Sequence, residues 1–280
     1  MVVALRLKDK FYEGIKWILI IFFSLYTLLP ILWLFITSLK SNAEYFANPF
    51  TFPAVPQIGN YINAITQANL FRMTLNSISI SAVAVLLNLF VASMAAYALS
   101  RFSFRGKEVI FIALSAGIMV PLNALMVPYY QVIHWTHMYD SLNALRIVYA
   151  AIGLPISILI IRGFIDSVPR EIEEAAYVDG CGFFGRFFKI VLPLSKCGII
   201  TAGTFQFITC WNEFVYANLL TSSPEHKTIQ LGIRYFTNQF TTDYVSMFAA
   251  IVVAIVPSII IYAFFQDQIV SGLTAGATKG

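Results

Sequence analysis

The charged residues best suited to chemistry are concentrated in residues 166–193 of an otherwise apolar chain. This segment opens with three carboxylates, Glu171, Glu173 and Glu174. They follow Pro169, which suits the first turn of a helix, and negative charge stabilises the positive end of a helix dipole. We therefore predict a short helix that ends at Gly180 and Gly182.

One face of this predicted helix is built for close contact with another surface. Small or apolar residues recur at helical spacing along it: Ile172, Ala175, Ala176 and Asp179. A second amphipathic turn follows, suited to the membrane interface, with four phenylalanines and two basic residues: Phe183, Phe184, Arg186, Phe187, Phe188 and Lys189. Periodicity alone leaves two interpretations open: a docking helix, or an ordinary interfacial helix with a solvated acidic face.

Two other motifs resemble ligand sites but lack necessary parts. His134 and His137 are spaced like half a metal site, yet no nearby acid or cysteine completes it. Beside Trp135 they are better interpreted as interfacial histidines. The Gly-Lys pair at Gly106 and Lys107 lacks the flanking Gly and Ser or Thr of a phosphate-binding loop. We therefore predict no metal, nucleotide or other cofactor on this chain.

Polar residues within apolar stretches are candidates for a translocation path. Glu213 is costly within a span, so it is either a functional group or a buried partner that holds helices together, with Asn212 or Gln206. Residues 74–99 are unusually polar for a span, although serines at helix contacts are common. Their polar residues are Asn76, Ser77, Ser79, Ser81, Asn88 and Ser93. The path candidates are Asn76, Asn88, Gln206, Asn212 and Glu213.

The elements that must position these residues are membrane helices. The 280 residues are 59% hydrophobic and 11% charged, whereas soluble domains carry about 25% charge. Six stretches are long enough, or nearly so, to cross a bilayer as helices. They are residues 16–38, 74–99, 109–133, 142–164, 197–220 and 245–265. We predict an all-α polytopic protein in contact with the lipid bilayer, a single domain over residues 1–280, with no nucleic-acid partner.

Charge distribution predicts the orientation of these spans. Most of the 18 Lys and Arg residues lie on the same side as the N-terminus if the spans alternate. The positive-inside rule then places both termini, and residues 166–193, in the cytoplasm. The first stretch is too long for the core of a secretory signal.

A defined pattern runs through the charged segment. Glu174-Ala175-Ala176 is followed after three residues by Gly180, and later by Ile190 and Leu192-Pro193. This pattern resembles the signature loop of the membrane subunits of ATP-binding-cassette (ABC) importers. The resemblance implies that the helix is a coupling helix held in a groove of an ATPase subunit. Its implied docking residues are Glu174, Ala175, Ala176, Asp179, Gly180, Ile190, Leu192 and Pro193.

Finer features resemble the second membrane subunit of maltose-type carbohydrate importers. These are Trp211-Asn212-Glu213-Phe214, Arg162-Gly163-Phe164 and the tail at residues 272–280. Asp267 and Gln268, and Arg146 within the fourth stretch, depart from the pattern expected of that family.

The resemblance implies a six-span type I ABC importer permease fold in a bacterial or archaeal cell membrane. It implies a non-catalytic subunit that works with a sister membrane subunit, two ATP-binding subunits that hold ATP and Mg, and an external solute-binding protein that delivers a sugar. Two alternatives remain: an ion-driven secondary transporter, and an intramembrane hydrolase that uses His134 and His137. The sequence does not identify the sugar.

Overall fold

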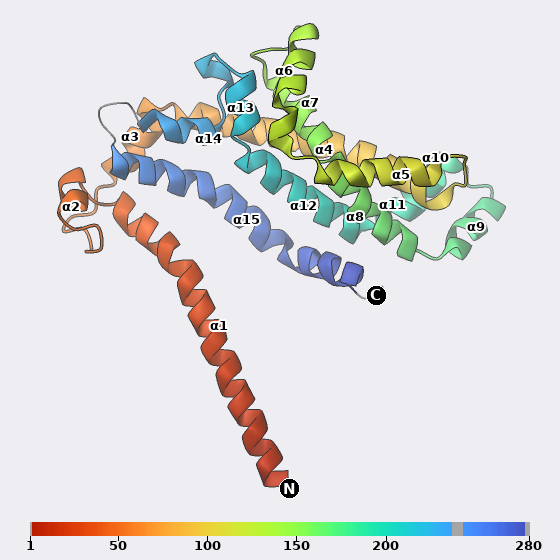
Figure 1. The fold of residues 1–280 in the computed structure, drawn as a ribbon, viewed down its shortest axis with the longest axis horizontal. Helices are drawn as coiled ribbons and strands as arrows, with labels where there is room; N and C mark the ends of the chain where they lie inside the picture. Colours follow the sequence, from red (N-terminus) through yellow and green to blue (C-terminus); the bar gives the residue numbers. More distant parts are fainter. Residues whose placement is uncertain (1, 237–242, 278–280) are drawn as a thin grey trace. The chain divides into compact units, whose positions relative to one another are not determined.

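The computed structural model describes the backbone of residues 2–236 and 243–277, and side chains within 12–236 and 243–268. The described part is helical and contains no strand. The described residues divide into two compact units, one within residues 1–69 and 233–253 and the other within residues 70–232 and 254–280. Figure 1 draws the helices of both. The single membrane domain over residues 1–280 stays a prediction.

The first unit contains the N-terminal helix α1, Val2–Ser38. It ends where the predicted span ends, at residue 38, but begins 14 residues before the predicted start at residue 16. From Tyr12 to Leu32 every residue is exposed, most of them large and apolar. Such a surface is expected of a helix whose solvent is lipid. The rest of the unit comprises α2 (Asn42–Ala47), α3 (Gly59–Gln67), η5 (Ile233–Phe236) and the start of α15 (Tyr244–Ala277).

A buried lysine organises the turn after α1. Lys40 is fully buried, and its Nζ donates to the Asn48 carbonyl (2.9 Å) and to Thr51 Oγ1 (3.2 Å). Asn60 Nδ2 donates to the carbonyls of Ser38 and Lys40 (2.8 and 2.7 Å). A buried ammonium is tolerated only with such partners, so these bonds fix the chain between α1 and α3.

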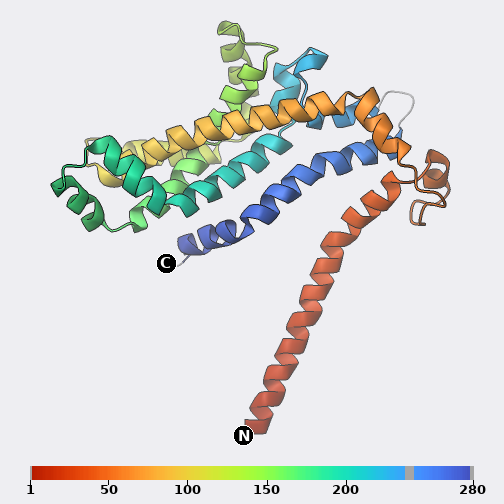
Figure 2. The same cartoon turned by 180° about the vertical axis from the view of Figure 1, so that it is seen from behind.

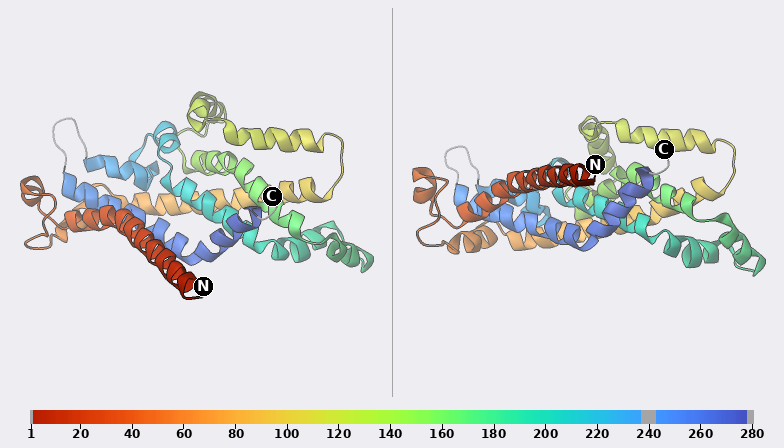
Figure 3. Two further views of the ribbon diagram at one scale, coloured as in Figure 1. Left: turned by 60° about the horizontal axis from the view of Figure 1, so that its bottom comes forward. Right: turned by 90° about the horizontal axis from the view of Figure 1, so that it is seen from below.

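The second unit is built around α4, Leu70–Arg101, which packs against α7 (Leu142–Ile152), α8 (Leu154–Ser167) and α12 (Lys196–Asn212) (Figures 2 and 3). Small residues let these helices approach closely. The small buried residues of α4 are Ser77, Ser81, Ala84, Ala92, Ser93, Ala96 and Ser100. The serines of the second predicted span therefore lie largely at helix contacts.

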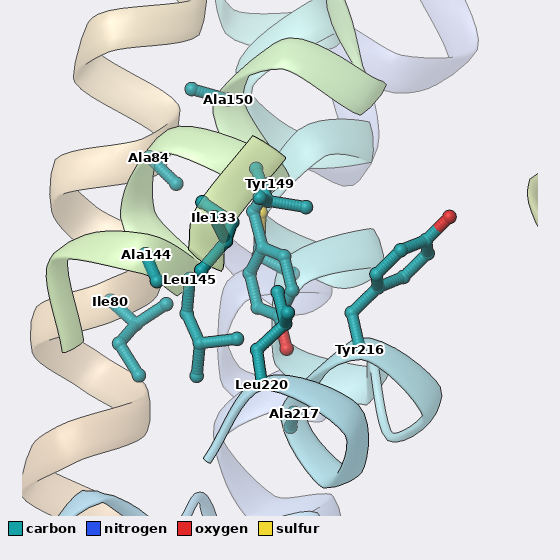
Figure 4. Packing of buried hydrophobic residues seen from close by; sticks show 12 residues of the cluster. Ile80, Ala84, Ile133, Ala144, Leu145, Tyr149, Ala150, Tyr216, Ala217 and Leu220 are labelled. Carbon is teal, nitrogen blue, oxygen red and sulfur yellow. The ribbon is translucent and has the colours of Figure 1, made fainter. Parts of the chain in front are cut away.

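Two hydrophobic clusters lie along α4. One joins α4, α6 (Met126–Trp135), α7 and α13 (Val215–Leu220), with Leu145, Tyr149 and Leu220 near its centre (Figure 4). The other lies nearer the C-terminal end of α4, where Tyr97, Ile161, Ile165 and Phe187 pack together. Both clusters belong wholly to the second unit.

The predicted third span, residues 109–133, is not one straight helix. It is divided into α5 (Lys107–Ala116), η1 (Gly117–Met119), η2 (Leu122–Leu125) and α6, with a bend of 102° between the two halves. Pro121 lies at the bend, and Val120 before it is extended (ψ 120°). A proline disfavours helical conformation in the preceding residue, which explains the break.

The fourth and fifth predicted spans are also divided. Residues 142–164 form α7 and α8, bent by 48° at Gly153, with Pro155 in the first turn of α8. Residues 197–220 form α12 and α13, which are separated by Glu213 and Phe214. Three of the six predicted stretches are therefore helical but divided, because proline or a capping side chain interrupts them.

Among the described residues, three helices are long and apolar enough to cross a membrane: Tyr12–Ser38, Leu70–Arg101 and Tyr244–Gln268. The α5–α6 and α7–α8 pairs raise the number to as many as five if each bent pair is one span. The count of six stays a prediction.

The segment 166–193 lies at the end of the unit where α4 ends (Figure 3). It consists of α9 (Arg170–Val178), α10 (Phe183–Arg186), the π-helical turn η3 (Phe187–Val191) and α11 (Leu192–Leu194). At the opposite end of α4, η4 (Pro224–His226) and α14 (Ile229–Gly232) follow α13.

Candidate functional site

The short helix predicted in the charged segment is present as α9. It begins at Arg170, directly after the extended Pro169. Its end is set by Gly180, whose φ of 81° lies in the left-handed region that favours glycine. The predicted end near Gly180 agrees with this turn, whereas Pro169 directly precedes the helix and does not lie in its first turn.

A buried carboxylate fastens α9 to α4. Glu173 is 6% exposed, and its side chain accepts hydrogen bonds from Arg101 Nε and from the Tyr97 hydroxyl (2.9 Å). Arg101 also donates through Nη2 to the Val168 carbonyl (2.7 Å). We name Tyr97, Arg101 and Glu173 the α4–α9 joint. Buried charges are stable only when they are paired and hydrogen-bonded, as these are.

Further bonds tie α4 to the chain just before α9. The Ser100 hydroxyl donates to Asp166 Oδ1, and Arg170 Nη2 donates to the Ser100 carbonyl (3.4 Å). Asp166 also pairs with Arg162 at 3.6 Å. The last turn of α4 therefore holds the chain on both sides of the extended residues Val168 and Pro169.

The returning arm packs on the same turn of α4. The Tyr97 ring lies 5.6 Å from the Phe183 ring and 5.1 Å from the Phe187 ring. Phe187 is buried, whereas Phe184 and Phe188 are exposed. Two of the four phenylalanines predicted for the membrane interface thus contact α4, but only Phe187 is buried, because Phe183 is still 40% exposed.

Most of the predicted docking residues on α9 are exposed. Glu174, Ala175, Asp179 and Gly180 are exposed, and Ala176 is half-buried. Ile172, Tyr177 and Val178 of α9 are also exposed, Val178 by 84%, and the Arg186 guanidinium lies 5.1 Å from the Tyr177 ring. Beside the joint, a hollow of about 180 Å³ separates α9 from the ends of α4 and α10. Its lining residues are Tyr97, Arg101, Phe102, Arg170, Glu173, Glu174, Tyr177 and Arg186.

The remaining docking candidates lie on the return to the bundle. Ile190 is half-buried in η3, Leu192 packs against the cluster around Ile161, and Pro193 lies in the first turn of α11. These residues shape the re-entry into α12 and are set apart from the exposed face of α9.

Three of the five path candidates are buried and bond to a backbone group of another segment. Asn88 Nδ2 donates to the Ala150 carbonyl, and Gln206 Nε2 to the Tyr149 carbonyl, both at 2.8 Å. Asn76 Nδ2 donates to the carbonyls of residues 225 and 227 (2.8 and 2.9 Å). All three are buried and tie α4 or α12 to a neighbouring segment.

Glu213 caps the helix that follows it. Its carboxylate accepts from the backbone N–H groups of Tyr216 (2.8 Å) and Ala217 (3.0 Å), and from the Tyr149 hydroxyl (2.6 Å). These partners differ from the expected Asn212 and Gln206. Asn212 is exposed on α12 and donates to the Ile208 carbonyl (3.0 Å). A capping carboxylate thus explains why the fifth predicted span is divided here.

A second group of polar contacts, centred on Asp140, lies near the other end of α4. Asp140 accepts hydrogen bonds from the backbone N–H groups of Ser222 (2.8 Å) and Ser223 (3.0 Å), from the Ser223 hydroxyl, and lies 3.3 Å from His226 Nδ1. Burial alone would raise the pKa of Asp140, but these hydrogen bonds outweigh it and lower the pKa well below its usual range. We name the segment that it holds, residues 221–229, the clasped loop.

The histidine motif forms a stack of rings. His134 lies between Tyr130 (4.3 Å between centroids) and Tyr139 (4.4 Å). His137 occupies a left-handed turn with φ 56°. In the part of the chain that the structure describes, no group of three His, Cys, Asp or Glu residues is placed to hold a metal.

The atypical residues have partners of their own. Arg146 donates to Asn143 Oδ1 (2.6 Å) and to Ser79 Oγ (2.5 Å). The Gln268 carbonyl accepts from Thr201 Oγ1 (2.9 Å). In the tail, α15 continues to Ala277, whereas its side chains from residue 269 and residues 278–280 lie outside the described part.

Sequence reasoning missed the joint and the polar contacts centred on Asp140. It singled out Glu174 rather than the adjacent Glu173, and gave no role to Tyr97, Arg101 or Asp140. One signal was available: Tyr97, Ser100 and Arg101 are spaced i, i+3 and i+4, which places three polar groups on one face at the end of an apolar helix.

Comparison with known proteins matches this chain to a family. Residues 88–274 match the family described as binding-protein-dependent transport system inner membrane component. This range contains α9, the joint residues on α4 and most of the bundle.

Two relatives cover nearly the whole chain. The sulfoquinovosyl glycerol transport system permease protein of Agrobacterium fabrum is 36% identical over 254 residues, 90% of this chain and 89% of its own length. The diacetylchitobiose uptake system permease protein of Streptomyces coelicolor is 30% identical over 97% of this chain and 90% of its own length. In fold, the chain is similar to one in the crystal structure of a bacterial ABC transporter involved in the import of the acidic polysaccharide alginate. The TM-score is 0.82 at 23% identity, covering 93% of this chain and 97% of that one.

Proposed function

The chain belongs to the family of binding-protein-dependent transport system inner membrane components, and we propose that it is a membrane-spanning subunit of an ATP-driven sugar importer. In this proposal the chain forms part of the translocation path and hydrolyses no ATP itself. Two ATP-binding subunits hold ATP and Mg, and a sister membrane subunit completes the path. An external solute-binding protein delivers the substrate.

The observation that carries this proposal is the exposed face of α9. Its small and apolar residues are uncovered at the end of a membrane bundle, while its buried face is fastened to α4. Exposed apolar surface of this kind marks a site of protein association. Docking of an ATPase subunit on Glu174, Ala175 and Ala176 would use this face without disturbing the joint.

The sugar assignment rests on the relatives. One is named for the transport of sulfoquinovosyl glycerol and another for the uptake of diacetylchitobiose. These substrates differ in size and chemistry, which supports a sugar or oligosaccharide as the class and leaves the individual sugar open. The positive-inside rule counts Lys and Arg alone, and their number near the N-terminus and in residues 162–196 supports both termini being cytoplasmic.

The five path candidates differ in how free their side chains are to contact a substrate. Asn76, Asn88 and Gln206 already bond within the chain, so substrate contact would have to replace those bonds. Asn212 is exposed, and Glu213 is half-buried at the break between α12 and α13. Asn212 is therefore the first residue to test for substrate contact.

Docking is tested by reversing one charge on α9 in the complete transporter. We expect Glu174→Lys to lower co-purification of the ATPase subunit, and ATP-driven uptake into vesicles, by about tenfold. The matched control is Glu171→Lys, which reverses an exposed charge on the same helix outside the docking residues. Normal uptake by the Glu174 variant would contradict the proposal, and uptake without any ATPase subunit would favour an ion-driven transporter.

A further inference from the structure

The backbone on either side of α9 is poorly suited to pass on a rotation. Before α9, Val168 and Pro169 are extended, with ψ of 124° and 135°. After α9, Gly180 adopts a left-handed conformation before the chain turns into α10. No continuous helix therefore joins α9 to α8 or to α12, and a force on α9 would be absorbed at these turns if the backbone were its only route.

Side-chain bonds connect α9 directly to α4. Tyr97 and Arg101 lie one turn apart on the same face of α4, and both bond the Glu173 carboxylate. Arg101 additionally bonds the carbonyl of Val168, the first of the two extended residues. Two donors from one helix to one carboxylate fix its orientation as well as its distance, because each bond constrains a different oxygen.

The helix that receives these bonds, α4, packs against several other helices of the bundle. α4 has 32 residues, so it is about 48 Å long. It packs against α7, α8 and α12 along that length. At its far end, the side chains of Asn76 and Ser77 hold the clasped loop.

From this arrangement we propose that Glu173 is a positioning residue that couples α9 to α4, which makes α4 the lever that carries movement of the ATPase subunit into the bundle. The inference rests on the proposed function, and assigns a role to a residue next to the docking motif. Glu174 faces the ATPase subunit, whereas the adjacent Glu173 transmits the displacement. In this proposal Glu174 serves docking of the ATPase subunit, and Glu173 serves transmission of its movement to α4.

The test uses Glu173→Gln in the complete transporter with its sister subunit, ATPase subunits and binding protein. The matched control is Glu171→Gln, an identical substitution on the exposed side of the same helix. The measurements are co-purification of the ATPase subunit, the rate of ATP hydrolysis, and sugar uptake into vesicles. We expect Glu173→Gln to retain the ATPase subunit and to lower the uptake per ATP hydrolysed by about tenfold, while the control matches the wild type.

A charge swap separates transmission from simple stabilisation. The double variant Arg101→Glu with Glu173→Arg restores the opposite charges of the pair, and we expect it to recover at least part of the lost coupling, which neither single substitution does. Thermal unfolding of each purified complex, measured in parallel, shows whether the less stable Glu173→Gln complex is still folded at the temperature of the uptake assay, so that a lower uptake per ATP reports lost coupling.

The outcomes distinguish this inference from the proposed function. If Glu173→Gln transports normally per ATP while the wild-type complex is ATP-driven, the lever role of Glu173 is wrong and the docking proposal stands. If Glu173→Gln loses the ATPase subunit and the swap restores nothing, Glu173 serves docking or folding, and the inference is again overturned. If the wild-type chain captures no ATPase subunit, the proposed function itself fails.

Discussion

The two ends of α4 are both gripped by distant segments of the chain, but by different chemistry. Near its start, Asn76 and Ser77 bond backbone groups of the clasped loop. Near its end, Tyr97 and Arg101 bond the carboxylate of Glu173. A neutral side chain on a backbone carbonyl holds a segment in place, whereas a buried charge pair ties two helices so that neither partner is easily lost alone.

The two ends of α4 differ in whether a buried charge takes part in the contact. The loop end relies on several moderate bonds, so removing one leaves the others intact. The α9 end also has several bonds, but its one buried ion pair is the Glu173 carboxylate with Arg101, and removing one partner leaves the other with an uncompensated burial cost. We expect these ends to differ accordingly when they are mutated.

The largest effect on stability is expected at the joint. Arg101→Ala leaves the buried Glu173 carboxylate without its cation, and we expect the free energy of unfolding to fall by about 3–5 kcal/mol. Denaturant unfolding of the purified protein in detergent measures this. Arg105→Ala, on the exposed loop after α4, is the control and should change stability by less than about 0.5 kcal/mol. Equal effects of the two variants would remove the basis of the comparison.

A smaller loss is expected at the opposite end. Asn76→Ala leaves the carbonyls of residues 225 and 227 without their donor, which should cost about 1–2 kcal/mol. Limited proteolysis should also cut the clasped loop faster in this variant. Asn218→Ala, on the exposed side of α13, should alter neither measurement. A loss as large as that of Arg101→Ala would mean that the two ends are equivalent.

The polar contacts at Asp140 should show a pH dependence of defined sign. Because hydrogen bonding lowers the pKa of Asp140 in the folded protein, its contribution is present above the unfolded pKa of about 3.9 and is lost as pH falls toward the folded pKa. We expect Asp140→Asn to cost about 1 kcal/mol at neutral pH. The difference between wild type and variant should be constant above about pH 5 and shrink below about pH 4. A difference that grows on acidification would show the opposite shift.

The smallest effect on stability is expected next to the joint. Glu174→Gln changes an exposed group, so the free energy of unfolding should move by less than about 0.5 kcal/mol. Its neighbour Glu173→Gln, measured in the same unfolding experiment, should be clearly less stable. Identical stabilities would indicate that the buried position of Glu173 does not hold in the isolated chain.

Much of this architecture was predictable from local rules. Apolar length predicted the helices α1, α4 and α15, since lipid leaves backbone groups no partner outside the helix. Pro169 and Gly180 set the ends of α9 because their backbone preferences act locally. The pattern Glu174-Ala175-Ala176 with Gly180 predicted the family to which the chain belongs.

The positions of the helix breaks inside the bundle were harder to predict from the sequence. Pro121 and Pro155 were visible in the sequence, yet Pro30 and Pro257 lie inside the uninterrupted helices α1 and α15. A proline in an apolar stretch therefore does not by itself predict where a membrane helix is interrupted. The break at Glu213 depended on a side chain that caps the next helix.

The sequence by itself determined that this is a helical membrane protein with a short acidic helix between two membrane segments, because hydrophobic length, charge and turn residues act over a few positions. Only the tertiary structure decided which acid of that helix is buried. Glu173 and Glu174 are adjacent and chemically identical, and differ by about 100° around α9. The end of α4 lies against one of these directions and leaves the other open, a choice made by contacts some 70 residues apart in the chain.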